Sequence, residues 1–214
     1  MAKYLTEFIG TFFLCLTIGL TVIGGSPMPA LPIGFSLMIM VYMGGPISGG
    51  HYNPAVTTAA VIRGALPGAQ ALPYMVSQLA GAMAAGLITG VITGDVISPE
   101  PSPDVSVGIA VLVEFLFTFA LALVVLNVAT SRRSQGNSYF GLAIGSTILV
   151  AVAAGGATSG GAFNPAVGLG LGLIDGLMGG ASMGHLWIYL VGPIAGGAVA
   201  AYVFLFQERE AATS

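Results

Sequence analysis

Charged side chains are scarce in this chain. Lys, Arg, Asp and Glu make up 6% of its 214 residues, whereas soluble domains carry about 25%. So few charges cannot cover a surface that faces water, and 56% of the residues are hydrophobic. The sequence therefore predicts an integral membrane protein. The formal net charge of −3 is too small to indicate a nucleic-acid partner.

Cysteine is almost absent as well. The single cysteine, Cys15, excludes an intramolecular disulfide and a cysteine-based metal site. It lies within an apolar run, where we expect it to pack against neighbouring helices. Motifs for nucleotide binding, metal binding or nucleophilic catalysis are lacking too. We therefore predict neither an enzyme nor a cofactor.

Long hydrophobic runs are the first feature that is present in quantity. A helix that crosses the hydrocarbon core of a bilayer needs about 20 apolar residues. Six runs qualify as spans, two of them short: residues 4–23, 31–45, 72–92, 107–128, 140–157 and 186–206. The first run follows Lys3 but is too long for the apolar region of a signal peptide, so we expect a retained helix.

The basic residues predict the orientation of these spans. All five fall at the two termini or in the segments after the second and fourth runs: Lys3, Arg63, Arg132, Arg133 and Arg209. With six spans, these places share one side of the membrane. The loop after the third run carries only acidic charges. The positive-inside rule then predicts a multi-pass protein of the plasma or inner membrane with both termini in the cytoplasm.

The two halves of the chain repeat one another. Asn-Pro-Ala-Val occurs at residues 53–56 and again 111 residues later, and EFIGTFFLCL at residues 7–16 parallels EFLFTFALAL at residues 114–123. We expect one channel domain with a first half at residues 1–95, a loop at 96–106 and a second half at 107–208. Each half holds three spans, so the second copy is inverted relative to the first, as in proteins with a central pathway between such repeats.

Each Asn-Pro predicts the start of a short helix. Asn is a favoured N-cap and Pro a favoured first helical residue, and Gly64 and Gly176 are suitable stops. About ten residues give a helix of ~15 Å, half of the ~30 Å core. Two such half-helices would enter from opposite faces and meet at the midplane. Glycine-rich lead-ins would supply the non-helical pore-lining backbone: Gly49, Gly50, His51, Tyr52, Gly160, Ala162 and Phe163.

The expected pore centre favours neutral molecules. Each half-helix presents roughly +0.5 charge at its N-terminus, which repels cations without a charged side chain. Each Asn can cap its own helix with its oxygen and leave its NH₂ as a donor toward the lumen. The residues of this centre are Asn53, Pro54, Ala55, Asn164, Pro165 and Ala166.

The chain resembles the aquaporin (major intrinsic protein) family in four features. These are two NPA boxes, the SGGH lead-in, the Glu-x-x-x-Thr-Phe opening of each half, and WIYLVGPIAGG in the last span. The resemblance covers nearly the whole chain. It implies an all-α membrane protein with an aquaporin-like inverted repeat of six transmembrane helices plus two re-entrant half-helices. It also implies a homotetramer in the lipid bilayer, a pore in each subunit, and passive transport without a cofactor.

The resemblance also locates a selectivity filter in which this chain departs from its family. Spacing from the NPA boxes assigns the filter to Ile33, Val152, Gly161 and Val167. Family members usually carry Arg where Val167 stands, and glycerol facilitators add Asp where this chain has Gly168. Without donors or aromatic rings the filter should be wide and apolar. A bacterial branch associated with arsenic resistance is similar in replacing this Arg with Val.

Four other polar residues need an interpretation, and for three of them there is an alternative. Glu7 and Glu114 are ionisable groups inside spans, which by default mark function; we expect them to hold re-entrant backbone through hydrogen bonds, and a proton relay is the alternative. His51 precedes the first box and serves either structural hydrogen bonding or solute contact and pH gating. His185 begins the last run beside Trp187 and is interpreted as an interfacial residue.

The leading hypothesis is a passive channel for small uncharged solutes, with arsenite and other metalloid acids, glycerol-like solutes and water as the candidates. A water-selective aquaporin is one alternative. An ion-coupled secondary transporter, which would have to rely on Glu7 or Glu114 for its coupling ion, is another. A non-conducting junction or scaffold protein is the third.

Overall fold

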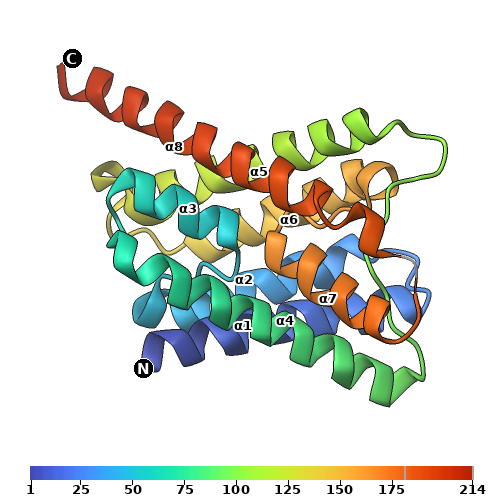
Figure 1. Ribbon diagram of the computed structural model, residues 1–214. Coiled ribbons are helices and arrows are strands. Elements are labelled where there is room, and N and C mark those ends of the chain that lie inside the picture. The colour runs from blue at the N-terminus through green and yellow to red at the C-terminus, as the bar shows by residue number, and fades with distance from the viewer. Residues whose placement is uncertain (181, 214) are drawn as a thin grey trace.

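The computed structural model of the protein describes residues 1–180 and 182–213, and these form a bundle of helices (Figure 1). Within these residues there are eight α-helices and three short 3-10 turns. The α-helices are α1 (Ala2–Ile23), α2 (Ala30–Ser48), α3 (Pro54–Arg63), α4 (Ala71–Thr93), α5 (Val107–Thr130), α6 (Phe140–Ser159), α7 (Pro165–Leu177) and α8 (Ile188–Thr213). The turns are η1 (Gly68–Gln70), η2 (Arg132–Ser134) and η3 (Ser182–His185).

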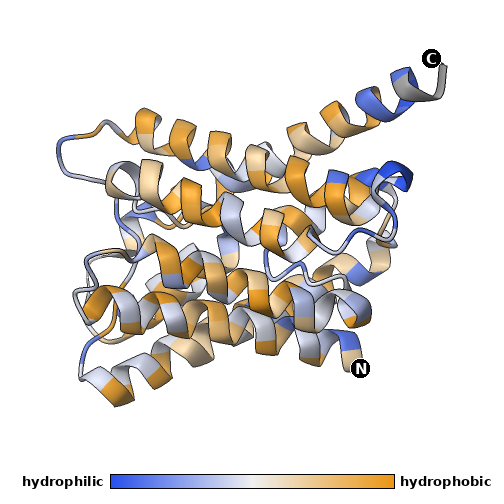
Figure 2. Cartoon of the chain, turned by 180° about the vertical axis from the view of Figure 1, so that it is seen from behind, coloured by the Kyte–Doolittle hydropathy of each residue, from blue (hydrophilic) through white to orange (hydrophobic). Residues whose placement is uncertain are grey.

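Six of these helices are long and apolar enough to cross a membrane: α1, α2, α4, α5, α6 and α8. Most of their residues are hydrophobic, as Figure 2 shows, and large hydrophobic side chains such as Leu72, Val91 and Tyr202 are among the most exposed. A surface of this kind is stable only against lipid. The predicted all-helical fold with six spans is confirmed.

The helices of the two halves pack in equivalent arrangements. Helix α1 packs on α4 and α5 packs on α8, while α2 and α6 pack on each other. The half-helices α3 and α7 cross between the halves, because α3 packs on α8 and α7 packs on α4. In Figure 1, α3 and α7 extend from the middle of the bundle toward opposite ends, and both chain termini lie at the end reached by α3.

Several helix boundaries differ from the sequence prediction, and the largest difference is at the end of α8, which continues to Thr213 where the apolar run predicted an end at residue 206. Helix α7 continues through Gly176 to Leu177. A Cβ atom on Gly176 would lie 2.7 Å from the Met183 side chain, so this glycine permits close packing and does not end the helix. Helix α8 begins at Ile188, later than predicted, and His185 belongs to the preceding turn η3.

Candidate functional site

The two half-helices begin in matched fashion at the centre of the bundle. Asn53 is the N-cap of α3 and its side-chain oxygen accepts from the backbone N–H of Ala55 at 2.8 Å. Asn164 is the N-cap of α7 and accepts from the N–H of Ala166 at 2.9 Å. In each helix a proline takes the first position, where no N–H is needed. The positive ends of both helix dipoles therefore point at the centre.

The segments that lead into the half-helices adopt unusual backbone conformations. Tyr52 and Phe163 have positive φ angles of 51° and 50°, a region that costs about 1–2 kcal/mol for residues with a side chain. The glycine pairs before them, at 49–50 and 160–161, also have positive φ. Together these residues turn the chain sharply at mid-depth so that a helix can start there.

Two buried glutamates hold these strained segments. Both are fully buried, and the described partners of their carboxylates are all donors. Glu7 in α1 accepts from Ser48 Oγ (2.7 Å), His51 N (3.0 Å), Tyr52 N (2.7 Å) and Gln78 Nε2 (2.7 Å). Glu114 in α5 accepts from Ser159 Oγ (2.8 Å), Ala162 N (3.0 Å) and Phe163 N (2.6 Å). Neither glutamate lines the central cavity, so neither is placed to bind a coupling ion on a transport path.

The two asparagines also join the halves of the chain. Asn53 Nδ2 donates to the carbonyl oxygen of Phe163 at 2.9 Å, and Asn164 Nδ2 donates to the carbonyl oxygen of Tyr52 at 2.8 Å. The sequence led us to expect each NH₂ group to donate toward the lumen and did not predict this bond between the halves. Each group has two hydrogens; one makes the bond between the halves, and one is left for a molecule in the lumen.

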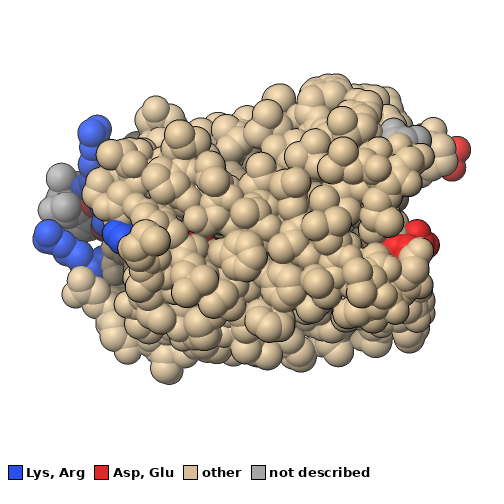
Figure 3. Space-filling view, turned by 60° about the horizontal axis from the view of Figure 1, so that its bottom comes forward, with Lys and Arg blue, Asp and Glu red and all other residues tan. Residues whose placement is uncertain are grey.

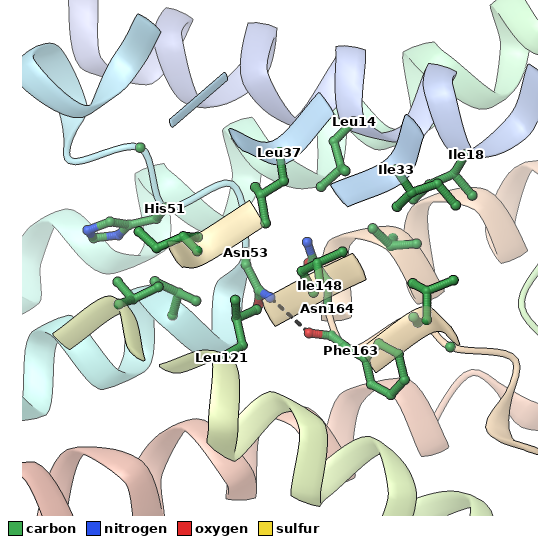
Figure 4. A pocket seen from close by; sticks show the side chains of 18 residues that line it. Leu14, Ile18, Ile33, Leu37, His51, Asn53, Leu121, Ile148, Phe163 and Asn164 are labelled. Atoms are coloured by element: carbon green, nitrogen blue, oxygen red, sulfur yellow. Dashed lines mark hydrogen bonds between the residues drawn. The ribbon is translucent and has the colours of Figure 1, made fainter. Parts of the chain in front are cut away.

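A narrow cavity runs past this centre. The centres of water molecules have only about 20 Å³ to occupy in it, which is room for one or two at a time. Figure 4 shows Asn53 and Asn164 in its middle, His51 toward one end, and Ile18 and Ile33 toward the other. Its eighteen lining residues include no charged carboxylate, lysine or arginine, so a polar molecule inside meets chiefly the asparagines, His51 and the backbone.

The cavity opens into a wider space at each end. The terminal vestibule, about 560 Å³, lies at the end with the chain termini and includes Lys3, Arg63, Gln70, Tyr74 and Thr130 in its lining. The loop vestibule, about 1110 Å³, lies at the opposite end and is lined by the segment 96–100 and by Asp175, among others. Figure 3 shows basic side chains gathered at one end of the molecule and acidic ones at the other.

The four predicted filter residues lie together. They line both the narrow cavity and the loop vestibule and so mark the junction of the two: Ile33, Val152, Gly161 and Val167. Among the predicted lead-in residues, four line the narrow cavity: Gly50, His51, Ala162 and Phe163. Gly49 lines the terminal vestibule and Gly160 the loop vestibule. Tyr52 is fully buried and is not among the lining residues of the cavity. The remaining residues of the two boxes are also buried and lie behind the asparagines: Pro54, Ala55, Pro165 and Ala166.

Eight apolar residues complete the wall of the cavity and were not predicted from the sequence: Leu14, Ile18, Leu37, Val56, Leu121, Val125, Ile144 and Ile148. The sequence repeat could have predicted them, because each of the eight is separated from another lining residue by the same offset as the repeated motifs. Among residues 1–180 and 182–213, no group of three or more His, Cys, Asp or Glu side chains could hold a metal ion.

The protein is a membrane bundle in which two half-helices meet at paired Asn-Pro-Ala boxes, and this narrows the choice of family. Comparison with known proteins identifies the family. The family model described as "Major intrinsic protein" matches residues 1–204. The chain belongs to the major intrinsic protein family.

The chain is similar over most of its length to curated relatives and to a solved structure. It is 36% identical to "Glycerol uptake facilitator protein-like 6" of Lactiplantibacillus plantarum, over 94% of this chain and 96% of that protein. It is 35% identical to "Aquaporin NIP1-1" of Zea mays, over 94% of this chain and 73% of that protein. The X-ray structure of the aquaglyceroporin from Plasmodium falciparum superposes with a TM-score of 0.83 at 23% identity, over 95% and 94% of the two chains.

Membership of this family assigns the class of function. The protein is a multi-pass membrane protein and a passive channel for small solutes, and it is not an enzyme. The secondary transporter and the scaffold, considered from the sequence alone, are thereby set aside.

Proposed function

We propose that the channel selects its solutes through a wide, apolar filter formed by Ile33, Val152, Gly161 and Val167. The observation that supports this is the position of these four residues at the junction of the narrow cavity and the loop vestibule. None of their side chains carries a hydrogen-bond donor, an aromatic ring or a charge. Molecules that pass this junction are sorted by size and by their tolerance of an apolar wall.

Other parts of the pore oppose the passage of ions. The first turns of α3 and α7 direct their partial positive charge at the asparagines, which disfavours cations. The apolar wall offers no compensation for the hydration that any ion would lose. Neutral solutes with hydroxyl or amide groups can instead bond the free N–H of each asparagine, so this arrangement favours them.

The substrates that best fit are small neutral polyhydroxylated molecules. Uncharged arsenite and related metalloid acids are candidates, since the chain resembles the bacterial branch that carries Val in place of the filter arginine. Glycerol is another, and the name of the Lactiplantibacillus plantarum relative supports it. Water, urea, methylated arsenicals and dissolved gases are further permeants to be compared with these.

The charges at the two ends support an orientation. Lys3 and Arg63 line the terminal vestibule, and Arg133 lies on the turn at the same end. The positive-inside rule then puts both termini in the cytoplasm of a plasma or inner membrane. The family resemblance implies a homotetramer, and because each chain encloses its own cavity, its four pores would be independent. The mass of the purified complex in detergent tests this.

The filter is tested by stopped-flow light scattering on proteoliposomes, with water, glycerol, urea and arsenite as solutes. Val167→Arg should lower glycerol and arsenite flux about tenfold, an effect of ~1.4 kcal/mol on the barrier, and should lower water flux less. The matched control is Val56→Arg, which adds the same side chain at the repeat-related position of the same wall. Equal losses for all solutes in Val167→Arg would contradict a role in selection.

A further inference from the structure

The wall of the narrow cavity has nearly the same chemistry in its two halves. Sixteen of its eighteen lining residues form eight pairs at the repeat offsets of 107 and 111 residues. Seven pairs match identical or similar residue types: Leu14–Leu121, Ile18–Val125, Ile33–Ile144, Leu37–Ile148, Gly50–Gly161, Asn53–Asn164 and Val56–Val167. The eighth pair is His51 and Ala162. With Val at position 167, the histidine is the one titratable side chain among the described lining residues.

His51 lies where the narrow cavity meets the terminal vestibule. Along with Val125, it belongs to the lining of both. In Figure 4 its ring stands at the end of the cavity opposite Ile18 and Ile33. A molecule that has crossed the apolar filter therefore passes this imidazole before it leaves, and meets no corresponding polar side chain at Ala162.

The ring of His51 is fixed on several sides. Its backbone N–H is bonded to Glu7 at 3.0 Å, its ring centroid lies 5.3 Å from that of Tyr74, and its Nδ1 lies 3.1 Å from Thr57 Oγ1. A Cβ atom on Gly49 would lie 3.0 Å from Nε2, so this nitrogen lies over Gly49, which lines the terminal vestibule. The ring is thus held with Nε2 toward the solute path.

The hydrogen bonds of Thr57 are compatible with a His51 ring that carries its hydrogen on Nδ1. Its hydroxyl lies 3.1 Å from the carbonyl oxygen of Asn53, to which it donates, and it accepts from Gln78 Nε2 at 3.0 Å. A hydroxyl has one hydrogen and two lone pairs. When its hydrogen is on Asn53, Thr57 accepts from His51 Nδ1; in this arrangement Nδ1 carries the hydrogen and Nε2 presents a lone pair, and our proposal uses this tautomer.

We propose that His51 is the specificity-determining residue of this pore for polar solutes, through an Nε2 lone pair that accepts a hydrogen bond from each permeating molecule. The filter with Val167 excludes by size, and the histidine end favours solutes that donate hydrogen bonds, such as glycerol and uncharged arsenite. This inference rests on the proposed function, because it assumes that neutral solutes cross the narrow cavity.

Two substitutions at His51 separate its polarity from its bulk. His51→Leu removes the acceptor and should lower glycerol flux about fivefold, the effect of one net hydrogen bond. His51→Gln keeps an acceptor and should retain most of the flux. Ala162→Leu is the matched control, since it places the same apolar side chain at the repeat-related position. Equal glycerol flux in the Leu and Gln variants of His51 would overturn the proposal.

A second measurement needs no variant at His51 and no change in fold. The chain has two histidines, so ¹⁵N-histidine labelling with a His185→Gln variant for assignment gives a single imidazole signal in lipid. Solid-state NMR should show the Nδ1–H tautomer, with an Nε2 shift that changes on addition of glycerol. An Nε2–H tautomer would refute the proposal. Absence of any solute flux in the wild-type protein would instead refute the proposed function itself.

Discussion

Replacing Glu114 with glutamine tests whether the buried carboxylate is what holds the second lead-in segment. The change preserves the shape of the side chain but converts one acceptor oxygen into an NH₂ group. Glu114 Oε1 accepts from Ser159 and Ala162, and Oε2 accepts from the N–H of Phe163. Glutamine keeps one oxygen, so in its better orientation it serves the first two donors and turns its NH₂ toward Phe163.

The expected loss follows from this count. One buried backbone N–H is left without an acceptor, which costs about 1–3 kcal/mol, and two remaining bonds lose the contribution of a charged acceptor, about 1 kcal/mol in all. We therefore expect Glu114→Gln to lower the free energy of unfolding by about 2–4 kcal/mol. For a chain of this size, that corresponds to a fall in melting temperature of roughly 4–16 °C.

The measurement is thermal unfolding of the purified protein in detergent, followed by size-exclusion chromatography, with solute flux measured in parallel. Ser159→Ala is the control, because it removes one donor and leaves the carboxylate with two others, so its effect should be about 1 kcal/mol. A melting temperature and flux in Glu114→Gln equal to those of the wild type would refute the argument that this carboxylate supports the strained backbone at Phe163.

Further outcomes can be measured in the same unfolding assay. Gly81→Ala should be strongly destabilising, by about 1–3 kcal/mol or more, because the new Cβ would meet the carbonyl oxygen of Phe8 in α1 and backbone cannot move aside as a side chain can. Gly108→Ala is its matched control, since nothing lies within 4 Å of a Cβ atom at that position, and it should be neutral or slightly stabilising. Similar losses of stability in the two variants would contradict the packing explanation. Glu208→Ala breaks the 2.7 Å ion pair with Arg133 and the 2.9 Å hydrogen bond from Ser131 Oγ. Because solvent reaches the ion pair and screens it, we expect the free energy of unfolding to fall by no more than about 1 kcal/mol; a larger fall would contradict this.

The parts of the fold that could be predicted depend on short stretches of sequence. The six spans follow from the length of the apolar runs, and the starts of α3 and α7 follow from the local chemistry of Asn-Pro. The end of α7 could not be predicted, because Gly176 serves packing against Met183, which is a tertiary contact.

The wall of the cavity was predictable only in part, for a related reason. Residues such as Leu14 and Ile148 face the lumen, yet they are as apolar as the residues that face lipid. Helical periodicity separates polar from apolar faces and cannot distinguish two apolar ones. The bonds between Asn53 and Phe163 and between Asn164 and Tyr52 were missed because they join residues 110 and 112 positions apart.

Those reciprocal bonds have a consequence for the order in which the protein is made. The carbonyl of Tyr52 and one N–H of Asn53 obtain their partners from residues 164 and 163, which are synthesised long after the first three spans. Until then, two polar groups that belong at mid-membrane depth have no partner there, a state that lipid does not tolerate. We therefore expect the first half-helix to reach its final depth only once the second has been synthesised, so that the centre of the pore is completed late in biogenesis.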